Sequence, residues 1–176
     1  HKPSKPIEPS ASATHGMIDE DVADYLPYLK VRPEVDYIIG HQIDFDAGAM
    51  DCMDMNRICT LALSREVWPE LDSHKLMAIV FYLDKYKGKE FFQTAHSVRT
   101  DILACAFVLE HIIDKLSITS FEELYAASEA DRIPKKMTFG MHDGKRPIDV
   151  PESYKDWYCG LPDADKYLVI AMGRGK

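Results

Sequence analysis

The middle of the chain contains two short apolar runs of the kind that form buried strands. The first is DYIIG at residues 36–40, which Gly40 ends, and the second is RICTLAL at residues 57–63, rich in apolar and β-branched residues. Between them, AGAMDCMDM at residues 47–55 predicts a helix that follows the first strand. We therefore expect a strand, a helix and a second strand in this order.

The most regular helical pattern is SVRTDILACAFVLEHIIDKL at residues 97–116. Its apolar positions recur at helical spacing and predict one wide apolar face on a long helix. The residues that define this face are Ile102, Cys105, Ala106, Leu109, Ile112 and Ile113.

Three further stretches have weaker helical patterns. Residues 17–35 predict an N-terminal helix, and a second helix is expected to begin at Ser73. A third is expected at residues 120–131, where Ser120 and Glu123 have the spacing of a capping box. The segments expected to be loops are 1–16 and 87–97.

Composition and charge narrow the possible functions. Apolar residues make up 46% of the chain and charged residues 28%, the balance of a globular protein that can bury a core. The net charge of -8 weighs against nucleic-acid binding through a broad basic surface, because phosphate neutralisation supplies most of such affinity. No apolar run approaches the ~20 residues that a membrane-spanning helix needs, so no membrane association is expected. The four cysteines form no CxxC pair, which favours a reducing, cytoplasmic compartment.

A change in composition near residue 131 predicts a boundary between two parts. The length of 176 residues suits one domain, or one domain with a small appendage. We expect a core at residues 1–131 and a small α+β module at residues 132–176, with a hairpin that turns at Asp143-Gly144. The module contains a cluster of basic residues, namely Arg132, Lys135, Lys136, Lys145 and Arg146.

Two carboxylates follow the first predicted strand, in the stretch GHQIDFDAGAM at residues 40–50. Asp46 is the stronger candidate for chemistry, although an acid at the start of a helix is commonly only an N-terminal acid that the helix dipole favours. Asp44 is the weaker candidate. If both acids face the same side of an extended segment, Phe45 between them must point to the core.

A second candidate pair lies at TAHSVRTD, residues 94–101. His96 stands in the loop before the long helix, and Asp101 stands in the first turns of that helix. The alternative is a surface histidine and an ordinary N-terminal acid. Because an apolar face follows Asp101 directly, we expect this acid to need a partner charge or a metal ion.

Asp46 and Asp101 together predict a site for hard cations. Mg²⁺ and Mn²⁺ take oxygen ligands and are bound through a few carboxylates together with substrate phosphates. Two such ions can activate a water and stabilise the leaving oxygen in phosphodiester cleavage. His96 is suited to act as the general base on that water, because its pKa lies near neutrality.

These motifs resemble those of the DEDDh family of 3′–5′ exonucleases, and within it the exonuclease X branch. GHQIDFDAGAM is similar to the family's second motif, with Asp46 as its metal-binding acid, and AHSVRTD is similar to the third, with His96 as base and Asp101 as metal ligand. The resemblance implies a ribonuclease-H-like α/β fold, a mixed sheet flanked by helices, and two Mg²⁺ or Mn²⁺ ions. It also implies that His15, Gly16 and Met17 contact the 3′ end of the substrate, together with Phe45.

One family motif has no counterpart in the chain. The first motif, Asp-x-Glu, supplies two of the family's four acidic ligands, and no Asp-x-Glu occurs anywhere in the sequence. Either the N-terminal strands are missing from the chain or the protein is a degenerate homologue, and the retention of Asp46, His96 and Asp101 favours the first explanation. The segment KKMTFGMHDGKRPIDVPESYKDWY, residues 135–158, resembles the small C-terminal module of exonuclease X-like proteins.

The resemblance predicts a proofreading or repair exonuclease that releases mononucleotides from a single-stranded 3′ end. DNA is favoured over RNA as the substrate, and a DNA polymerase or another replication or repair protein is a candidate partner. The alternative function is a catalytically inactive nucleic-acid-binding or polymerase-accessory module. An RNA-trimming enzyme of the same family is a third candidate, because discrimination at the 2′-hydroxyl depends on the shape of the pocket.

Overall fold

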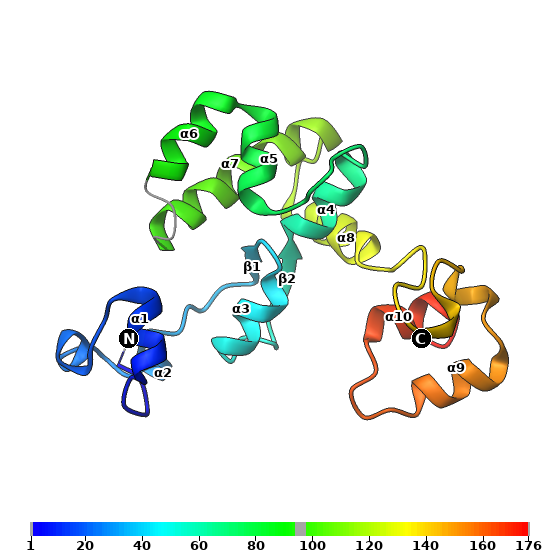
Figure 1. The fold of residues 1–176 in the computed structure, drawn as a ribbon, viewed down its shortest axis with the longest axis horizontal. Coiled ribbons are helices and arrows are strands. Elements are labelled where there is room, and N and C mark those ends of the chain that lie inside the picture. Colours follow the sequence, from blue (N-terminus) through cyan, green and yellow to red (C-terminus); the bar gives the residue numbers. More distant parts are fainter. Residues whose placement is uncertain (1, 94–97, 176) are drawn as a thin grey trace. The chain divides into compact units, whose positions relative to one another are not determined.

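The computed structural model describes residues 2–93 and 98–175. The chain divides into two compact units, His1–Asp36 and Tyr37–Lys176. Most helices belong to the second unit, which also contains the sheet (Figure 1).

The first unit consists of short helical segments. The expected loop at residues 1–16 is wrong in part, because Pro9, a residue suited to the first helical turn, opens a helix there. The expected helix at residues 17–35 is interrupted, since Pro27 lacks the N–H that a continuous helix needs. The elements of this unit are α1 (Pro9–His15), the 3₁₀ helix η1 (Asp19–Val22) and α2 (Tyr28–Val31).

A parallel pair of strands begins the second unit. Strand β1 (Tyr37–Gly40) pairs with β2 (Asn56–Cys59) in parallel, and α3 (Ile43–Ala49) lies between them in the chain. A parallel pair requires such a crossover connection, so the predicted order of strand, helix and strand is confirmed. The helix begins four residues earlier than expected, at Ile43 instead of residue 47.

The second apolar run is shared between a strand and a helix. Strand β2 ends at Cys59, and α4 (Thr60–Val67) begins with the next residue. Ala62 and Leu63 are buried in the helix rather than in a strand. A short apolar run predicts burial but does not by itself distinguish a buried strand from a buried helix.

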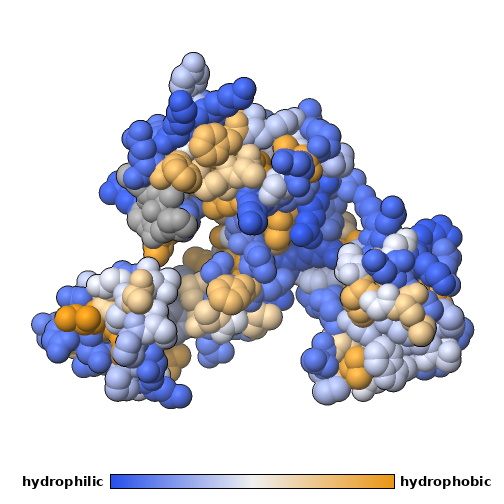
Figure 2. Space-filling view, in the orientation of Figure 1, coloured by the Kyte–Doolittle hydropathy of each residue, from blue (hydrophilic) through white to orange (hydrophobic). Residues whose placement is uncertain are grey.

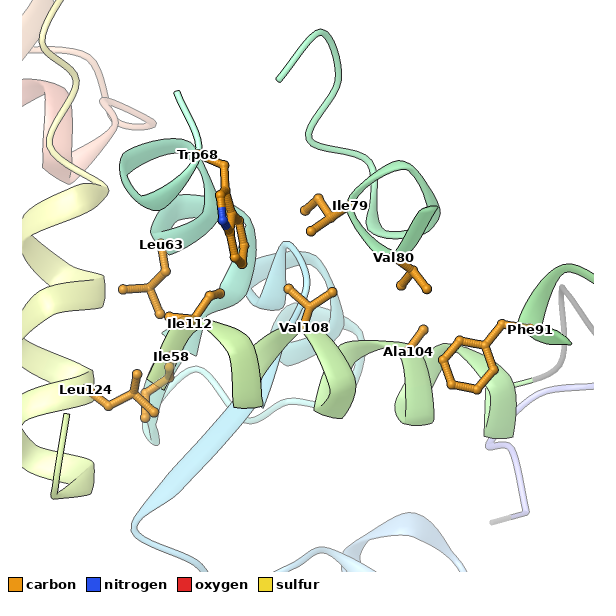
Figure 3. Close-up of a cluster of buried hydrophobic side chains, with 10 residues drawn as sticks. All are labelled: Ile58, Leu63, Trp68, Ile79, Val80, Phe91, Ala104, Val108, Ile112 and Leu124. Carbon is orange, nitrogen blue, oxygen red and sulfur yellow. The ribbon is translucent and has the colours of Figure 1, made fainter. Parts of the chain in front are cut away.

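The main core of the second unit lies between α7 (Val98–Leu116) and the helices around it. Buried side chains from α7 face those from α4 and α5 (Leu76–Leu83), as Figure 3 shows. Helix α8 (Phe121–Asp131) closes the core beside β2, and the side chain of Ser120 accepts a hydrogen bond from the Glu123 amide, as the capping pattern predicts. The buried core residues are Ile58, Leu63, Trp68, Ile79, Val80, Phe91, Ala104, Val108, Ile112 and Leu124.

Helix α6 (Lys85–Gln93) occupies most of a segment expected to be a loop. A Cβ atom at Gly88 would lie 2.6 Å from Cδ1 of Phe81, so glycine allows α6 to approach the Phe81 ring of α5 closely. Gly is unfavourable within helices, which explains why the local pattern predicts no helix here. Apolar side chains, in pale orange, gather over α5 and α6 in the upper part of Figure 2.

The segment after α8 has its own small core. Its elements are η2 (Gly140–His142), η3 (Pro147–Asp149), α9 (Glu152–Cys159) and α10 (Lys166–Ala171). The buried side chains of this second core are Met137, Val150, Tyr158, Leu168 and Met172.

The predicted hairpin in this segment is wrong, because residues 132–175 contain no strand in the structure. The loop at residues 137–145 is closed by two backbone hydrogen bonds instead, from the Met137 amide to the Lys145 carbonyl (2.7 Å) and from the Gly144 amide to the Met137 carbonyl (2.9 Å). The module is therefore helical rather than α+β. The separate core supports a boundary near residue 131, which stays a prediction.

In the part of the chain that the structure describes, no helix is both long enough and apolar enough to cross a bilayer.

Candidate active site

The turn from β1 into α3 places Asp46. Gln42 has a left-handed backbone conformation, with φ of 67°, at the residue before α3. A Cβ atom at Gly40 would lie 2.7 Å from Cδ1 of Ile43, so glycine lets the Ile43 side chain pack closely against the end of β1. Ile43 and Ala47 are buried and fix one side of α3, which leaves Asp46 exposed on another side.

Asp46 and Asp101 line the same pocket, whose volume is about 710 Å³. Asp46 lies in α3, the helix that follows β1, and Asp101 lies in the first turn of α7. Gly40 and His41 at the end of β1 also line this pocket. The structure thus brings together the two carboxylates that the sequence singles out as metal ligands.

The expected reason for a metal at Asp101 does not hold. Asp101 is exposed rather than close to the core, so burial does not oblige it to take a partner charge. Among residues 2–93 and 98–175, no group of three or more His, Cys, Asp or Glu side chains is arranged to hold a metal ion. The pocket thus contains two carboxylates, and their predicted role as metal ligands stays a prediction.

The apolar face expected on α7 is divided between the core and this pocket. Ile112 is buried in the core, together with Ala104 and Val108, which lie on a neighbouring face of the helix. The residues of the expected face that line the pocket are Ile102, Cys105, Ala106 and Leu109, of which Leu109 also packs against the core. The two carboxylates consequently stand at a pocket with a mainly apolar wall.

His41 is a pocket residue to which the sequence assigned no role. Its Nδ1 lies 3.1 Å from Oγ1 of Thr60, and its Nε2 lies 2.8 Å from the carbonyl oxygen of His74. Burial lowers the pKa of His41 from its ordinary value, and the nearby guanidinium of Arg65 lowers it further, while the hydrogen bond with the His74 carbonyl raises it. The imidazole links the end of β1 to α4 and to the segment before α5.

Phe45 does not point to the core, contrary to the expectation. Its exposed fraction is 75%. It lines a smaller pocket of about 320 Å³ together with His41, Gln42 and Asp46. The helix begins at Ile43, so Phe45 follows helical geometry instead of strand alternation, and its ring is available beside Asp46.

His15, Gly16 and Met17 form a tight turn at the end of α1. Gly16 has φ of 72°, a left-handed conformation that suits glycine at a helix C-terminus. The Met17 amide donates a hydrogen bond to Nδ1 of His15 at 3.1 Å. These residues belong to the first unit, and their predicted contact with the 3′ end of a substrate stays a prediction. His96, the predicted general base, lies outside the described residues.

Asp44 has a role that the sequence did not indicate. Its Oδ1 accepts a hydrogen bond from Nε of Arg57 at 2.7 Å and lies 3.4 Å from Nη1 of Arg132. The side chains of the two arginines are only 10% and 5% exposed. Because Arg132 is 88 residues away in sequence, no local pattern could identify this contact.

The chain is similar in sequence to exonucleases. No protein-family model matches it. Exodeoxyribonuclease 10 of Escherichia coli strain K12 is 26% identical over 157 residues, which cover 86% of this chain and 69% of that protein. DNA polymerase III subunit epsilon of Pasteurella multocida strain Pm70 is 33% identical over 86 residues, which cover 39% of this chain and 34% of that protein.

A solved structure shows the same fold. Exonuclease X in complex with 5′ overhanging duplex DNA superposes with a TM-score of 0.52 and 24% sequence identity, over 72% of this chain and 77% of that chain. The predicted ribonuclease-H-like α/β fold is therefore confirmed. In sequence the chain is thus similar to exonucleases, and in fold it is similar to exonuclease X.

Proposed function

We propose that this protein is a 3′–5′ exonuclease that hydrolyses DNA and releases nucleoside monophosphates by a two-metal mechanism. One observation carries the proposal: Asp46 and Asp101, the two acids that match the family motifs, line one pocket. The relationship to exodeoxyribonuclease 10 supports the choice of DNA as the substrate.

In this proposal, Asp46 and Asp101 bind the metal ions. Carboxylate oxygens are the ligands that Mg²⁺ and Mn²⁺ prefer, so the donor chemistry of the pocket fits these ions. The number of donors fits only in part, since the family uses four acidic ligands and the chain has no Asp-x-Glu motif. When bound, the two ions supply Lewis-acid stabilisation of the attacking and leaving oxygens.

The remaining chemistry is assigned to His96 and a water molecule. His96 accepts a proton from the water molecule while the oxygen of that water attacks the phosphorus of the terminal phosphodiester. The bond between that phosphorus and the 3′ oxygen of the preceding nucleotide breaks, and this oxygen takes up a proton from solvent to become a 3′-hydroxyl. The products are a nucleoside 5′-monophosphate and a strand shortened by one nucleotide.

Substrate contacts are proposed for four residues. Phe45, exposed beside Asp46, is suited to stack on a base, because every base presents a π-face to an aromatic ring. His15, Gly16 and Met17 are proposed to contact the 3′ nucleotide by the resemblance of their motif. A single-stranded 3′ end is the proposed substrate, and a polymerase or another replication or repair protein is a candidate partner.

A second candidate function rests on the missing motif. Without Asp-x-Glu, the two acids at the pocket are fewer than the family's catalytic set. The same fold would then serve as a catalytically inactive nucleic-acid-binding or polymerase-accessory module. Binding of single-stranded DNA without hydrolysis in the presence of Mg²⁺ or Mn²⁺ would identify this function.

The decisive experiment follows a 3′-labelled single strand in the presence of Mg²⁺, with the full-length polypeptide. The exonuclease proposal expects labelled mononucleotide to be released, and expects no release with EDTA or with the His96→Ala variant. Undiminished activity of His96→Ala would contradict the assigned base. A matched RNA strand, assayed in parallel, distinguishes a DNA exonuclease from an RNA-trimming enzyme.

A further inference from the structure

The helix that carries Asp46 is held by two arginines through Asp44. Arg57 extends from β2, and its Nε donates a hydrogen bond to Oδ1 of Asp44 at 2.7 Å. Arg132, which follows α8, approaches the same oxygen atom with its Nη1 at 3.4 Å. Asp44 lies two residues before Asp46 in α3, a helix of seven residues.

Arg132 is nearly inaccessible and depends on its partners. Its side chain is only 5% exposed, and a buried charge is stabilised only when paired and hydrogen-bonded. Besides Asp44, its Nη1 contacts Oε1 of Glu129 at 3.2 Å. The third partner of Nη1 is the hydroxyl oxygen of Tyr167.

Tyr167 belongs to α10 in the C-terminal module. Its residue is 8% exposed, and its hydroxyl donates a hydrogen bond to Oε1 of Glu129 at 2.7 Å while it accepts from Arg132. The Nζ atom of Lys166 lies 3.4 Å from Oε2 of the same Glu129. The path from the module to α3 thus consists of three side chains, Tyr167, Arg132 and Asp44.

We propose that the C-terminal module positions Asp46 through this path of Tyr167, Arg132 and Asp44. The inference rests on the proposed function, in which Asp46 binds a metal ion. Tyr167 and Asp44 are positioning residues. They hold α3 in position and contact neither the metal nor the DNA. The module is in this view a support of the active site.

The charges of the module favour this role over contact with the nucleic-acid backbone. Three of its five predicted cluster bases are already paired with carboxylates of the protein. Arg132 pairs with Asp44, Lys135 with Glu66, and Arg146 with Asp149. Paired bases offer less net charge to phosphates, since binding of phosphate depends on cations that are free to neutralise it.

Because α3 is short, it depends on contacts with the rest of the protein for its stability. A helix of seven residues is not stable by itself, because isolated helices shorter than about 12–15 residues are marginal in water. Its buried anchors are Ile43 and Ala47, which hold one side. The ion pairs of Asp44 hold another side and restrict the movement of the residues that follow, including Asp46.

Hydrogen exchange of the full-length polypeptide, without metal or DNA, tests the proposal directly. The amides of Met50 and Cys52, which donate to the carbonyls of Asp46 and Ala47, report the opening of α3. In Tyr167→Phe their exchange should become ~10-fold faster, the equivalent of one lost hydrogen bond to a charged group. Asp44→Asn should have at least the same effect.

The control removes a hydroxyl elsewhere in the same module. Tyr154→Phe, whose ring packs on His142 and Trp157, should leave exchange at Met50 and Cys52 unchanged. Because Tyr167 and Asp44 act along one path, the double variant should exchange less rapidly than the product of the two single effects. Unchanged exchange in Tyr167→Phe would overturn the proposal, and so would an equal acceleration along α7, which would indicate general destabilisation.

Metal dependence provides a second measurement and separates this proposal from the proposed function. In Tyr167→Phe the Mn²⁺ concentration for half-maximal nuclease activity should rise roughly 10-fold, at the lower end of effects for residues that support metal ligands. The KM for DNA should stay the same, whereas a module that binds DNA would show the reverse pattern and overturn the proposal. If Asp46→Asn retained full activity, the proposed function would fail, whatever the result with Tyr167→Phe.

Discussion

Asp46 and Asp101 line one pocket although they lie in separate helices, α3 and α7. Helix α3 packs on β1 and β2, whereas α7 packs on α4 and α5, and the two acids meet at the pocket beside the end of β1. The pocket is therefore a product of the tertiary fold and of no single segment.

Replacing either acid by asparagine should abolish the metal-dependent activity. Asp46→Asn and Asp101→Asn keep the shape of the side chain but remove the charge, and we expect a loss of more than about 100-fold in each, beyond the effect of residues that only support ligands. The measurement is the release of mononucleotide at saturating Mg²⁺. Both acids are exposed, so the melting temperature without metal should change little.

Asp51→Asn provides the control for this pair. Asp51 stands soon after Asp46 in sequence, but it is not part of the pocket wall. Its φ of 49° is a conformation that asparagine also tolerates. A comparable loss of activity in Asp51→Asn would show that activity depends on negative charge in this region, and not specifically on Asp46 and Asp101.

Phe45→Ala should weaken binding of single-stranded DNA without affecting stability. The ring is 75% exposed, so its removal costs little packing. Stacking of an aromatic ring on one base contributes about 1–3 kcal/mol, so the Kd for a single strand should rise about 5-fold or more. Fluorescence anisotropy with a labelled oligonucleotide measures this change.

Tyr86→Ala is the matched control for Phe45. Tyr86 is 85% exposed and lies in α6. Its removal takes an exposed aromatic side chain from a part of the surface outside the pocket. Equal loss of DNA affinity in the two variants would show that Phe45 has no special contact with the bases.

The sequence predicts the elements whose local pattern agrees with the tertiary fold. Helix α7 has a continuous apolar pattern, β1 ends at a glycine, and Ser120 caps α8, so all three are predicted correctly. Helix α6 is missed because Gly88 lowers the local helix propensity, while its close packing on Phe81 becomes visible only in the fold.

The candidate site is only partly predictable for the same physical reason. Motif resemblance selects Asp46 and Asp101, and the structure brings them to one pocket. The role of Asp44 depends on Arg132, whose position is set by the end of α8 and by Tyr167. Contacts between residues so distant in sequence leave no periodic pattern, and the outward direction of Phe45 follows from the early start of α3.

Asp131→Asn should stabilise the protein at neutral pH. Burial and the nearby charge of Glu66 raise the pKa of Asp131 from 3.8 to about 6, while Lys135 lowers it. A raised carboxyl pKa means that the folded state binds the proton more tightly than the unfolded state. The contribution of this carboxyl group to the free energy of unfolding is therefore fully present below pH 3.8. It is lost as the pH rises through about 6.

The variant should thus gain stability above pH 6 and none near pH 4. Because Asp131 is only partly buried, solvent screening reduces the effect to about 1 kcal/mol or less at pH 7. Thermal unfolding from pH 4 to pH 8 measures the difference. In Asp149→Asn, the control, no gain is expected, because the hydrogen bond from Arg146 lowers the pKa of Asp149. A gain for Asp131→Asn that did not depend on pH would contradict this explanation.

His41→Phe should destabilise the protein most at pH 7.5 and less at pH 5.5. The variant removes the contacts of the imidazole with Oγ1 of Thr60 and with the His74 carbonyl, and leaves that carbonyl without this partner, at a cost of about 1–3 kcal/mol. Since burial lowers the pKa of His41, the unfolded state takes up a proton more readily than the folded state, and the native protein loses stability as the pH falls below 6.5. The phenylalanine variant lacks this loss, so the free energies of unfolding of the two proteins should converge in acid.

Urea unfolding at the two pH values measures the convergence. The control is Thr60→Val, which removes the same hydrogen bond but leaves a titratable His41 in place. A difference between His41→Phe and the native protein that stays constant from pH 7.5 to pH 5.5 would show that His41 is not held in its neutral form by the fold.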